Sequence, residues 1–470
     1  MKRYLLGLLV VASIGAMTSC SKDDNGSTPT TDSTSAYVTL SGDIKTNTTL
    51  SANKKYFLKG FVYVMSGATL TIEPGTVITG DKVTNGTLVV TRGGKINATG
   101  TVDKPIVFTS AQPAGSRREG DWGGVILLGK APVNAAGGEA KIEGGLTPTA
   151  GGDEKTYIYY GGSDAADNSG TLKYVRIEFA GVAYSPDNEI NGLTMGGVGN
   201  GTTISYVQVY RSGDDAFEWF GGTVNCDHLI ATYAWDDDFD TDNGFSGRVQ
   251  FGLSQRYRTI ADQSGSNGFE SDNDANGSTN APQTKAVFSN MTIVGPGSTG
   301  SINANYQHGV QIRRNSSMSL YNSLIIGFPY GFYLDDSKVV SHKTSANATE
   351  GTLVFSHNII AGSTQAATKS EWANADPTAY AAWWTATKTT VLPNATDVML
   401  ANPYQFSAGV ASSNVGTPSF LLKTGSPALT GADFANLTTG FTATTYVGAF
   451  DGTNDWTKTW TTAGAEKTVY

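Results

Sequence analysis

The sequence predicts an all-β protein, a right-handed parallel β-helix whose coils stack along one axis. One observation is a repeated triplet of Phe, an acid and a third residue, at 217–219, 239–241 and 269–271. The acids of the first two triplets are 22 residues apart and those of the last two 30, which suits one coil of a solenoid. A second observation is the composition: 16% of the residues are charged and 57 are Gly, as expected of a rigid, turn-rich β body.

Residues 1–19 are expected to be a secretory signal peptide. A short basic start, Met1–Arg3, precedes the apolar run Tyr4–Val11, which is too short to span a membrane. The stretch Ala16–Cys20 resembles a bacterial lipobox, which implies cleavage before Cys20 and a lipid on its thiol.

Residues 20–36 are expected to carry the lipid, a surface-export signal and a flexible linker. The residues after the cysteine resemble the export signal of Bacteroidetes lipoproteins; they are Ser21, Lys22, Asp23 and Asp24. The remainder has linker composition without periodicity. These features predict a protein anchored by lipid in the outer membrane and facing the cell exterior.

Residues 37–135 are expected to form an N-terminal cap and the first coils. Short alternating segments, among them 69–79, 87–91 and 122–128, are separated by Gly and Asn turns, which is the pattern of β-strands. A cap is needed at this end because an open coil exposes a sheet edge.

Residues 136–362 are expected to form the body of the β-helix. Strands that end in Gly recur at 291–295, 323–327 and 358–362. One turn of these coils is expected to hold a structural ladder of Asn290, Asn322 and Asn358. Cys226 is expected to be a small buried residue within a strand.

An acidic ladder is predicted on the outside of this body. If each Phe points inward, the acid after it points outward, because strand side chains alternate. The predicted ladder is Glu218, Asp240, Glu270, Gln311 and Tyr333. Carboxylates stacked about 4.8 Å apart repel each other, which suggests a compensating cation or a cationic ligand group.

Residues 363–470 lose the coil pattern and are expected to form a C-terminal cap region, with a short helix around Trp383 and Trp384. As a whole, the chain resembles the right-handed parallel β-helix surface lipoproteins of Bacteroidetes, through the phrases DWGGVILLG at 121–129 and YVGAFDGTNDW at 446–456. The resemblance implies a fold and a location, and little chemistry.

The density of carboxylates predicts a calcium site. Ca²⁺ takes six to eight oxygen ligands, and the 12-residue spacing of an EF-hand is missing, so neighbouring coils would have to pool their ligands. The predicted ligands are Asp237, Asp238, Asp240, Asp242, Glu270 and Asp272. The alternative is that Asp residues serve the turns through local hydrogen bonds, which would account for Asp214, Asp215 and Asp236.

The first functional hypothesis is a binding module. A long, flat sheet suits an extended polysaccharide or another surface ligand, for adhesion or for nutrient capture together with outer-membrane partner proteins. The residues expected to contact this ligand are Glu218, Tyr233, Trp235, Arg313 and Tyr333. The formal net charge of −9 argues against nucleic acid as a partner.

The second hypothesis is an enzyme, either a calcium-dependent polysaccharide lyase or another glycan-degrading β-helix. In a lyase, Arg313 is the candidate base for the C5 proton, although an ion pair with Asp272 or Asp242 is an alternative role. In a hydrolase, Asp240 would act with Glu218 or Glu270. No complete catalytic motif is present, so the sequence assigns no catalytic residue.

Overall fold

The computed structural model describes residues 37–185, 188–297, 300–339, 341–437 and 439–470. The predicted signal peptide, the lipid-bearing Cys20, the export signal at 21–24 and the linker lie outside these residues. Within the described ranges, no helix is long and apolar enough to cross a membrane.

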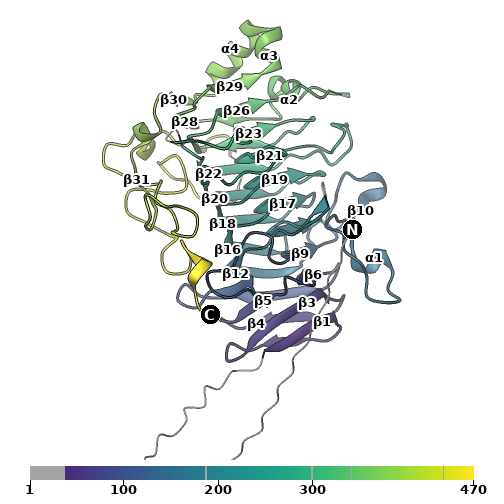
Figure 1. Cartoon of the computed structure of the whole chain (residues 1–470). Coiled ribbons are helices and arrows are strands. Elements are labelled where there is room, and N and C mark those ends of the chain that lie inside the picture. The colour runs from purple at the N-terminus through teal and green to yellow at the C-terminus, as the bar shows by residue number, and fades with distance from the viewer. Residues whose placement is uncertain (1–36, 186–187, 298–299, 340, 438) are drawn as a thin grey trace, which may run out of the picture. The chain divides into compact units, whose positions relative to one another are not determined.

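The chain winds as a parallel β-helix, in which strands of successive coils pair side by side (Figure 1). One column of strands, the ladder stack, contains β6 (Thr87–Val90), β9 (Val125–Leu128), β15 (Leu193–Gly196), β17 (Phe217–Phe220), β19 (Phe239–Asp242), β21 (Phe269–Ser271), β23 (His308–Ile312), β26 (Tyr330–Leu334) and β29 (Ala366–Ser370). The prediction of an all-β, parallel β-helix is confirmed.

A second column, the long-strand stack, contains β12 (Gly170–Glu178), β16 (Thr203–Tyr210), β18 (Asn225–Thr232), β20 (Arg248–Gln255), β22 (Val287–Val294), β24 (Ser319–Tyr321), β25 (Leu324–Ile326), β27 (Phe355–Ser356), β28 (Ile359–Ala361) and β30 (Thr390–Leu392). The first coils are built by β1 (Val38–Ile44), β2 (Thr48–Leu50), β3 (Lys55–Val64), β4 (Thr69–Ile72), β5 (Val77–Gly80), β7 (Lys95–Thr99) and β8 (Ile106–Ser110). The smaller elements are β10 (Glu139–Lys141), α1 (Glu154–Tyr157), β11 (Tyr159–Gly161), β13 (Ala183–Ser185), β14 (Asn188–Glu189), α2 (Thr344–Glu350), α3 (Glu371–Ala375), α4 (Pro377–Ala386), β31 (Leu400–Asn402) and β32 (Ser419–Leu422).

The core of the solenoid is formed by side chains that stack from coil to coil. The rings of Phe217, Phe239 and Phe269 point inward and stack with centroid distances of 5.7 and 5.1 Å. Cys226 is a free, buried thiol in β18, as predicted. Because this inward column is fully occupied by Phe, the acid that follows each Phe has to lie on the outer face.

Each long strand bends at one residue in the left-handed conformation. The residues in this column are Tyr174, Tyr206, His228, Phe251, Asn290, Asn322 and His357. The Asn ladder is therefore only partly as predicted, because His357 takes the bend and Asn358 lies one position beyond it. Asn358 still serves its coil, since its Oδ1 accepts a hydrogen bond of 2.9 Å from the backbone N–H of Ser323.

The C-terminal region is not simply a cap, which corrects the prediction for residues 363–470. α3 and α4 cover the last coil, where Trp384 packs on Phe332 and Phe355 with ring-centroid distances of 6.2 and 6.0 Å. Residues 393–470, the strap, return along the side of the coils toward their N-terminal end (Figure 1). Side chains of the long-strand stack hold it: Gln255 donates to the carbonyls of residues 403 and 405, Gln250 to that of 442 and Gln208 to that of 462.

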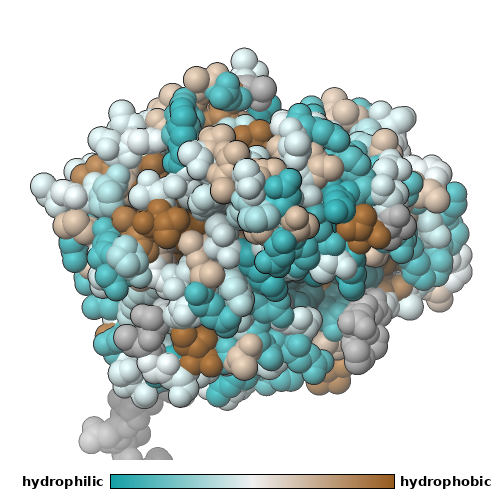
Figure 2. Space-filling model, turned by 90° about the horizontal axis from the view of Figure 1, so that it is seen from above, coloured by the Kyte–Doolittle hydropathy of each residue, from teal (hydrophilic) through white to brown (hydrophobic). Residues whose placement is uncertain are grey.

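The strap ends in the first coils. The Tyr470 hydroxyl donates to the buried Glu178 carboxylate at 2.7 Å, and its ring lies beneath the guanidinium groups of Arg117 and Arg176. In Figure 2, the view from above shows scattered apolar patches among polar residues and no continuous apolar face.

Candidate functional site

The acidic ladder has the predicted register. Glu218 pairs with Asp240 across β17 and β19, and Asp240 with Glu270 across β19 and β21. The ladder continues through Gln311 and Tyr333. Three successive coils thus place a carboxylate at the same outer position, which follows from the alternation of strand side chains.

Turns before β17 and β19 bring further carboxylates beside this ladder. Three triads have oxygen atoms within 4.8 Å of one another: Asp214–Asp215–Asp236, Asp215–Glu218–Asp240 and Asp237–Asp240–Glu270. We call these seven residues the carboxylate cluster. Asp215 and Asp240 each belong to two triads, so the cluster is one continuous group. The sequence alternative, in which Asp214, Asp215 and Asp236 serve only their turns, does not account for this proximity.

Burial and mutual repulsion raise the pKa values of the cluster. Burial raises the pKa of Glu270 to about 8, with Arg313 acting in the opposite direction and Asp272 adding to the rise. Burial, and to a lesser extent repulsion by neighbouring carboxylates, raises the pKa values of Asp215, Glu218 and Asp240 well above their ordinary range. Two unit charges 4.8 Å apart repel by about 3.5 kcal/mol at an effective dielectric constant of about 20. Without a cation, the cluster therefore has to retain protons.

The cluster fits a hard divalent cation. Asp236 Oδ1 and Asp240 Oδ1 are buried and have no hydrogen-bond partner among the described residues. Carboxylate oxygens that neither solvent nor a donor satisfies are suited to a metal that prefers oxygen ligands, such as Ca²⁺. Of the six predicted ligands, the structure brings Asp237, Asp240 and Glu270 into one triad.

The other three predicted ligands have different surroundings. Asp238 is fully buried, and its Oδ2 accepts a hydrogen bond of 2.9 Å from Arg256 Nε. Its carboxylate therefore faces an internal cation and not the cluster. Asp242 accepts a hydrogen bond of 2.6 Å from the N–H of Asn243. Asp272 is paired with two arginines, as described below.

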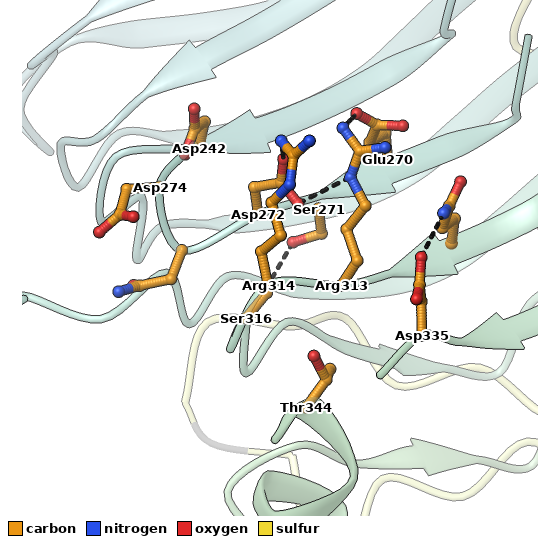
Figure 3. A network of polar contacts seen from close by, with 12 residues as sticks. Asp242, Glu270, Ser271, Asp272, Asp274, Arg313, Arg314, Ser316, Asp335 and Thr344 are labelled. Carbon is orange, nitrogen blue, oxygen red and sulfur yellow. Dashed lines mark hydrogen bonds and ion pairs between the residues drawn. The ribbon is translucent and has the colours of Figure 1, made fainter. Parts of the chain in front are cut away.

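Arg313 is held by carboxylates at one end of the cluster (Figure 3). Its Nη2 contacts Glu270 Oε1, and its Nε lies 2.9 Å from Asp272 Oδ1, while Arg314 Nη1 lies 2.6 Å from Asp272 Oδ2. Glu270 and Asp272 raise the pKa of Arg313 above its ordinary value, against the effect of burial. Of the two roles considered for Arg313, this geometry agrees with the ion pair with Asp272 and not with the base, because a guanidinium held between two carboxylates does not release its proton.

A basic pocket adjoins this end of the ladder. It has a volume of about 240 Å³ and includes Arg313, Arg314, Lys338 and Lys369 in its wall. Lys369 occupies the ladder position after Tyr333, and its Nζ lies 4.0 Å from the centre of the Tyr333 ring. The outer face therefore changes from acidic to basic along a single column of strands.

The three predicted aromatic contacts differ in exposure. Tyr233 is 0% exposed in an aromatic cluster beneath the strap, whereas Tyr333, 4% exposed, lies beneath Lys369 in the wall of the basic pocket. Trp235 is 41% exposed and directly precedes Asp236 of the cluster. Trp235 is therefore the most exposed of the three.

Sequence reasoning missed the contribution of the segment between β9 and β12. Its Glu143 accepts a hydrogen bond of 3.3 Å from Asn191 Nδ2, which also donates to Glu218 of the ladder. Burial raises the pKa of Glu143 to about 7. No periodic signal marks Glu143, because it reaches the ladder from a long connection outside the coil repeat.

Comparison with known proteins agrees with this architecture. A family model described as a pectate-lyase-like beta helix domain matches residues 42–399. No curated protein and no solved structure matches the chain. The match covers the coils, the carboxylate cluster and the basic pocket, and it ends within the first residues of the strap.

Proposed function

The chain belongs to the pectate-lyase-like β-helix family, and from this premise we propose that it binds an anionic polysaccharide with the help of divalent cations, Ca²⁺ in the first place. The observation that carries the proposal is the continuous carboxylate cluster beside a basic pocket on one outer face. A polymer with regularly spaced carboxylate or sulfate groups could satisfy both parts at once. One anionic group would bind the cations, and another would bind Lys369 or Arg314.

The charges explain why a cation would be required. The described acids of the cluster outnumber the nearby guanidinium groups, and the arginines at its end are already paired with Glu270 and Asp272. An anionic polymer would be repelled by the acidic part unless a cation reversed its charge. When bound, Ca²⁺ would supply that reversal, with Asp237, Asp240 and Glu270 as one ligand set and Asp215, Glu218 and Asp240 as another.

Isothermal titration calorimetry of the chelated protein with CaCl₂ tests the cation site. Saturable binding that weakens in Asp240→Asn is expected, while the exposed Asp103→Asn serves as the matched control with unchanged binding. Affinity electrophoresis in polygalacturonate gels then tests the ligand, and retardation is expected with calcium and not with chelator. Absence of calcium binding in the wild-type protein would contradict the proposal.

Cleavage of the same polymer is a second candidate function. The observation in its favour is that buried carboxyl groups with raised pKa values have oxygen atoms within 4.8 Å of one another, near the separation of about 5–5.5 Å between the acid and the nucleophile of a retaining glycosidase. New reducing ends without unsaturated products would indicate a hydrolase, and unsaturated products would indicate a lyase. Intact polymer after prolonged incubation would leave binding as the function.

We also propose that the protein is a lipoprotein of the outer membrane that faces outward. The support is the sequence around Cys20, followed by Ser21, Lys22, Asp23 and Asp24. Metabolic labelling with a fatty acid should mark the wild-type protein and not Cys20→Ala. Surface proteolysis of intact cells should degrade the wild-type protein, and full protection would contradict the outward orientation.

A further inference from the structure

A separate pocket lies between the coils and the strap. Its volume is about 480 Å³, which is within the range of sites for small ligands. Turns that follow β20, β22 and β28 form one wall, and strap residues 393–396, 404, 406 and 414 form another. It shares no lining residue with the carboxylate cluster or the basic pocket.

Glycines at the ends of strands make this pocket by letting the strap approach. Gly327 has φ +72°, and a Cβ there would lie 2.6 Å from the Tyr404 hydroxyl. Gly362 has φ +65°, and a Cβ there would lie 2.5 Å from the backbone nitrogen of Ala395. The glycines that follow these strands therefore allow the strap to lie close to the coils.

The lining residues carry two hydroxyl groups without a hydrogen-bond partner among the described residues. Tyr404 Oη and Ser363 Oγ are buried and have no hydrogen-bond partner among the described residues. Leaving a buried hydroxyl unsatisfied costs about 1–3 kcal/mol, so two such groups in the wall of one pocket point to a ligand that satisfies them.

Aromatic rings complete the wall. Tyr257 and Phe406 meet edge to face at 4.9 Å, and both line the pocket together with Tyr404. The described lining residues include no carboxylate, so they offer no anionic group to a metal ion or a cationic ligand. The guanidinium of Arg258, a charged group in this lining, lies 5.5 Å from the centre of the Tyr257 ring.

We propose that this pocket binds an uncharged sugar residue. Sugars combine apolar C–H faces, which pack on aromatic rings, with hydroxyls that both donate and accept hydrogen bonds. The pocket offers the matching groups: ring surfaces, the two unsatisfied hydroxyls, and the amides of Asn394 and Asn414. A neutral sugar site beside a site for an anionic polymer would let the protein recognise a mixed or branched polysaccharide.

Saturation-transfer difference NMR tests the proposal with the methyl glycosides of glucose, galactose and mannose, and with glucuronate as the anionic comparison. Saturable binding of at least one neutral glycoside is expected, and it should persist in chelator because no acid lines the pocket. Tyr404→Phe and Ser363→Ala should each weaken binding about fivefold, by the loss of one hydrogen bond to the ligand. Neither should lower the melting temperature, because neither hydroxyl has a partner inside the protein.

The controls separate this site from the rest of the surface. The exposed Ser116→Ala should bind as the wild-type protein does, and Asp240→Asn should do so as well. Binding of none of the neutral glycosides, or of glucuronate alone, would overturn the proposal. So would binding that Tyr404→Phe and Ser363→Ala both leave unchanged, since the sugar would then occupy another site.

Discussion

Replacing Asp240 with Asn is expected to raise stability without calcium and to reduce the stabilisation that calcium gives. The oxygen atoms of Asp240 lie within 4.8 Å of those of Asp215 and Glu218 in one triad, and of Asp237 and Glu270 in another. The substitution keeps the size of the side chain and removes its charge. At pH 8 without calcium, Asp240 either is repelled by an ionised neighbour at this distance, by about 3.5 kcal/mol at an effective dielectric constant of about 20, or holds a proton that it would release in the unfolded chain, and Asn avoids both costs. The variant should therefore melt at a higher temperature than the wild-type protein.

With calcium the difference in stability should narrow. At a free concentration 100-fold above the dissociation constant, calcium would stabilise the wild-type protein by about 2.7 kcal/mol. Asp240→Asn removes a ligand from two triads, so we expect it to bind calcium at least about tenfold more weakly, a loss of about 1.4 kcal/mol.

Differential scanning fluorimetry at pH 8, with chelator and with CaCl₂, gives the four melting temperatures that are needed. Asp103→Asn is the control, and it should follow the wild-type protein in both conditions. If Asp240→Asn melts below the wild-type protein in chelator, the carboxylates do not repel one another and the reasoning fails. If calcium leaves the wild-type melting temperature unchanged, the cluster is not a calcium site.

Three further predictions concern the same region. Burial raises the pKa of Glu270 from 4.5 to about 8, so between these pH values the folded metal-free protein holds a proton that the unfolded chain releases. The free energy of unfolding, measured by chemical denaturation at each pH, should therefore fall as the pH rises from about 4.5 to about 8. A rise over this range would contradict the prediction. Arg313→Gln removes a positive charge beside Glu270, so calorimetry should show tighter calcium binding and gels should show weaker retention by polygalacturonate. If calcium binding and polymer retention both weakened or both strengthened, the assigned contacts would be contradicted. Arg256→Ala leaves Asp238 buried without its partner and should cost about 3–5 kcal/mol in unfolding free energy, whereas a change below about 1 kcal/mol would show that the pair is not buried in solution.

Strand alternation is a local property of the backbone, which is why the ladder could be predicted from the sequence. The inward column of Phe217, Phe239 and Phe269 fixes the outward position of the acid after each of them. Turns follow no such rule. Asp238 directly precedes β19, where a strand would place it on the outer face, yet it is fully buried against Arg256.

The sequence by itself thus determined the fold class and the register of the acidic ladder, because both depend on a repeat within the chain, and the buried position of Cys226, because a lone cysteine behaves as a small apolar residue. Only the tertiary structure decided the remaining contacts between charges. Arg313 also reaches Glu270, 43 residues earlier, from the turn after β23, and Glu143 reaches the ladder from a connection outside the repeat. The return of the strap, and with it the second pocket, also depended on contacts between distant residues such as Gln208 and Thr462. Such contacts depend on where long connections fold back, and neither periodicity nor spacing encodes that path.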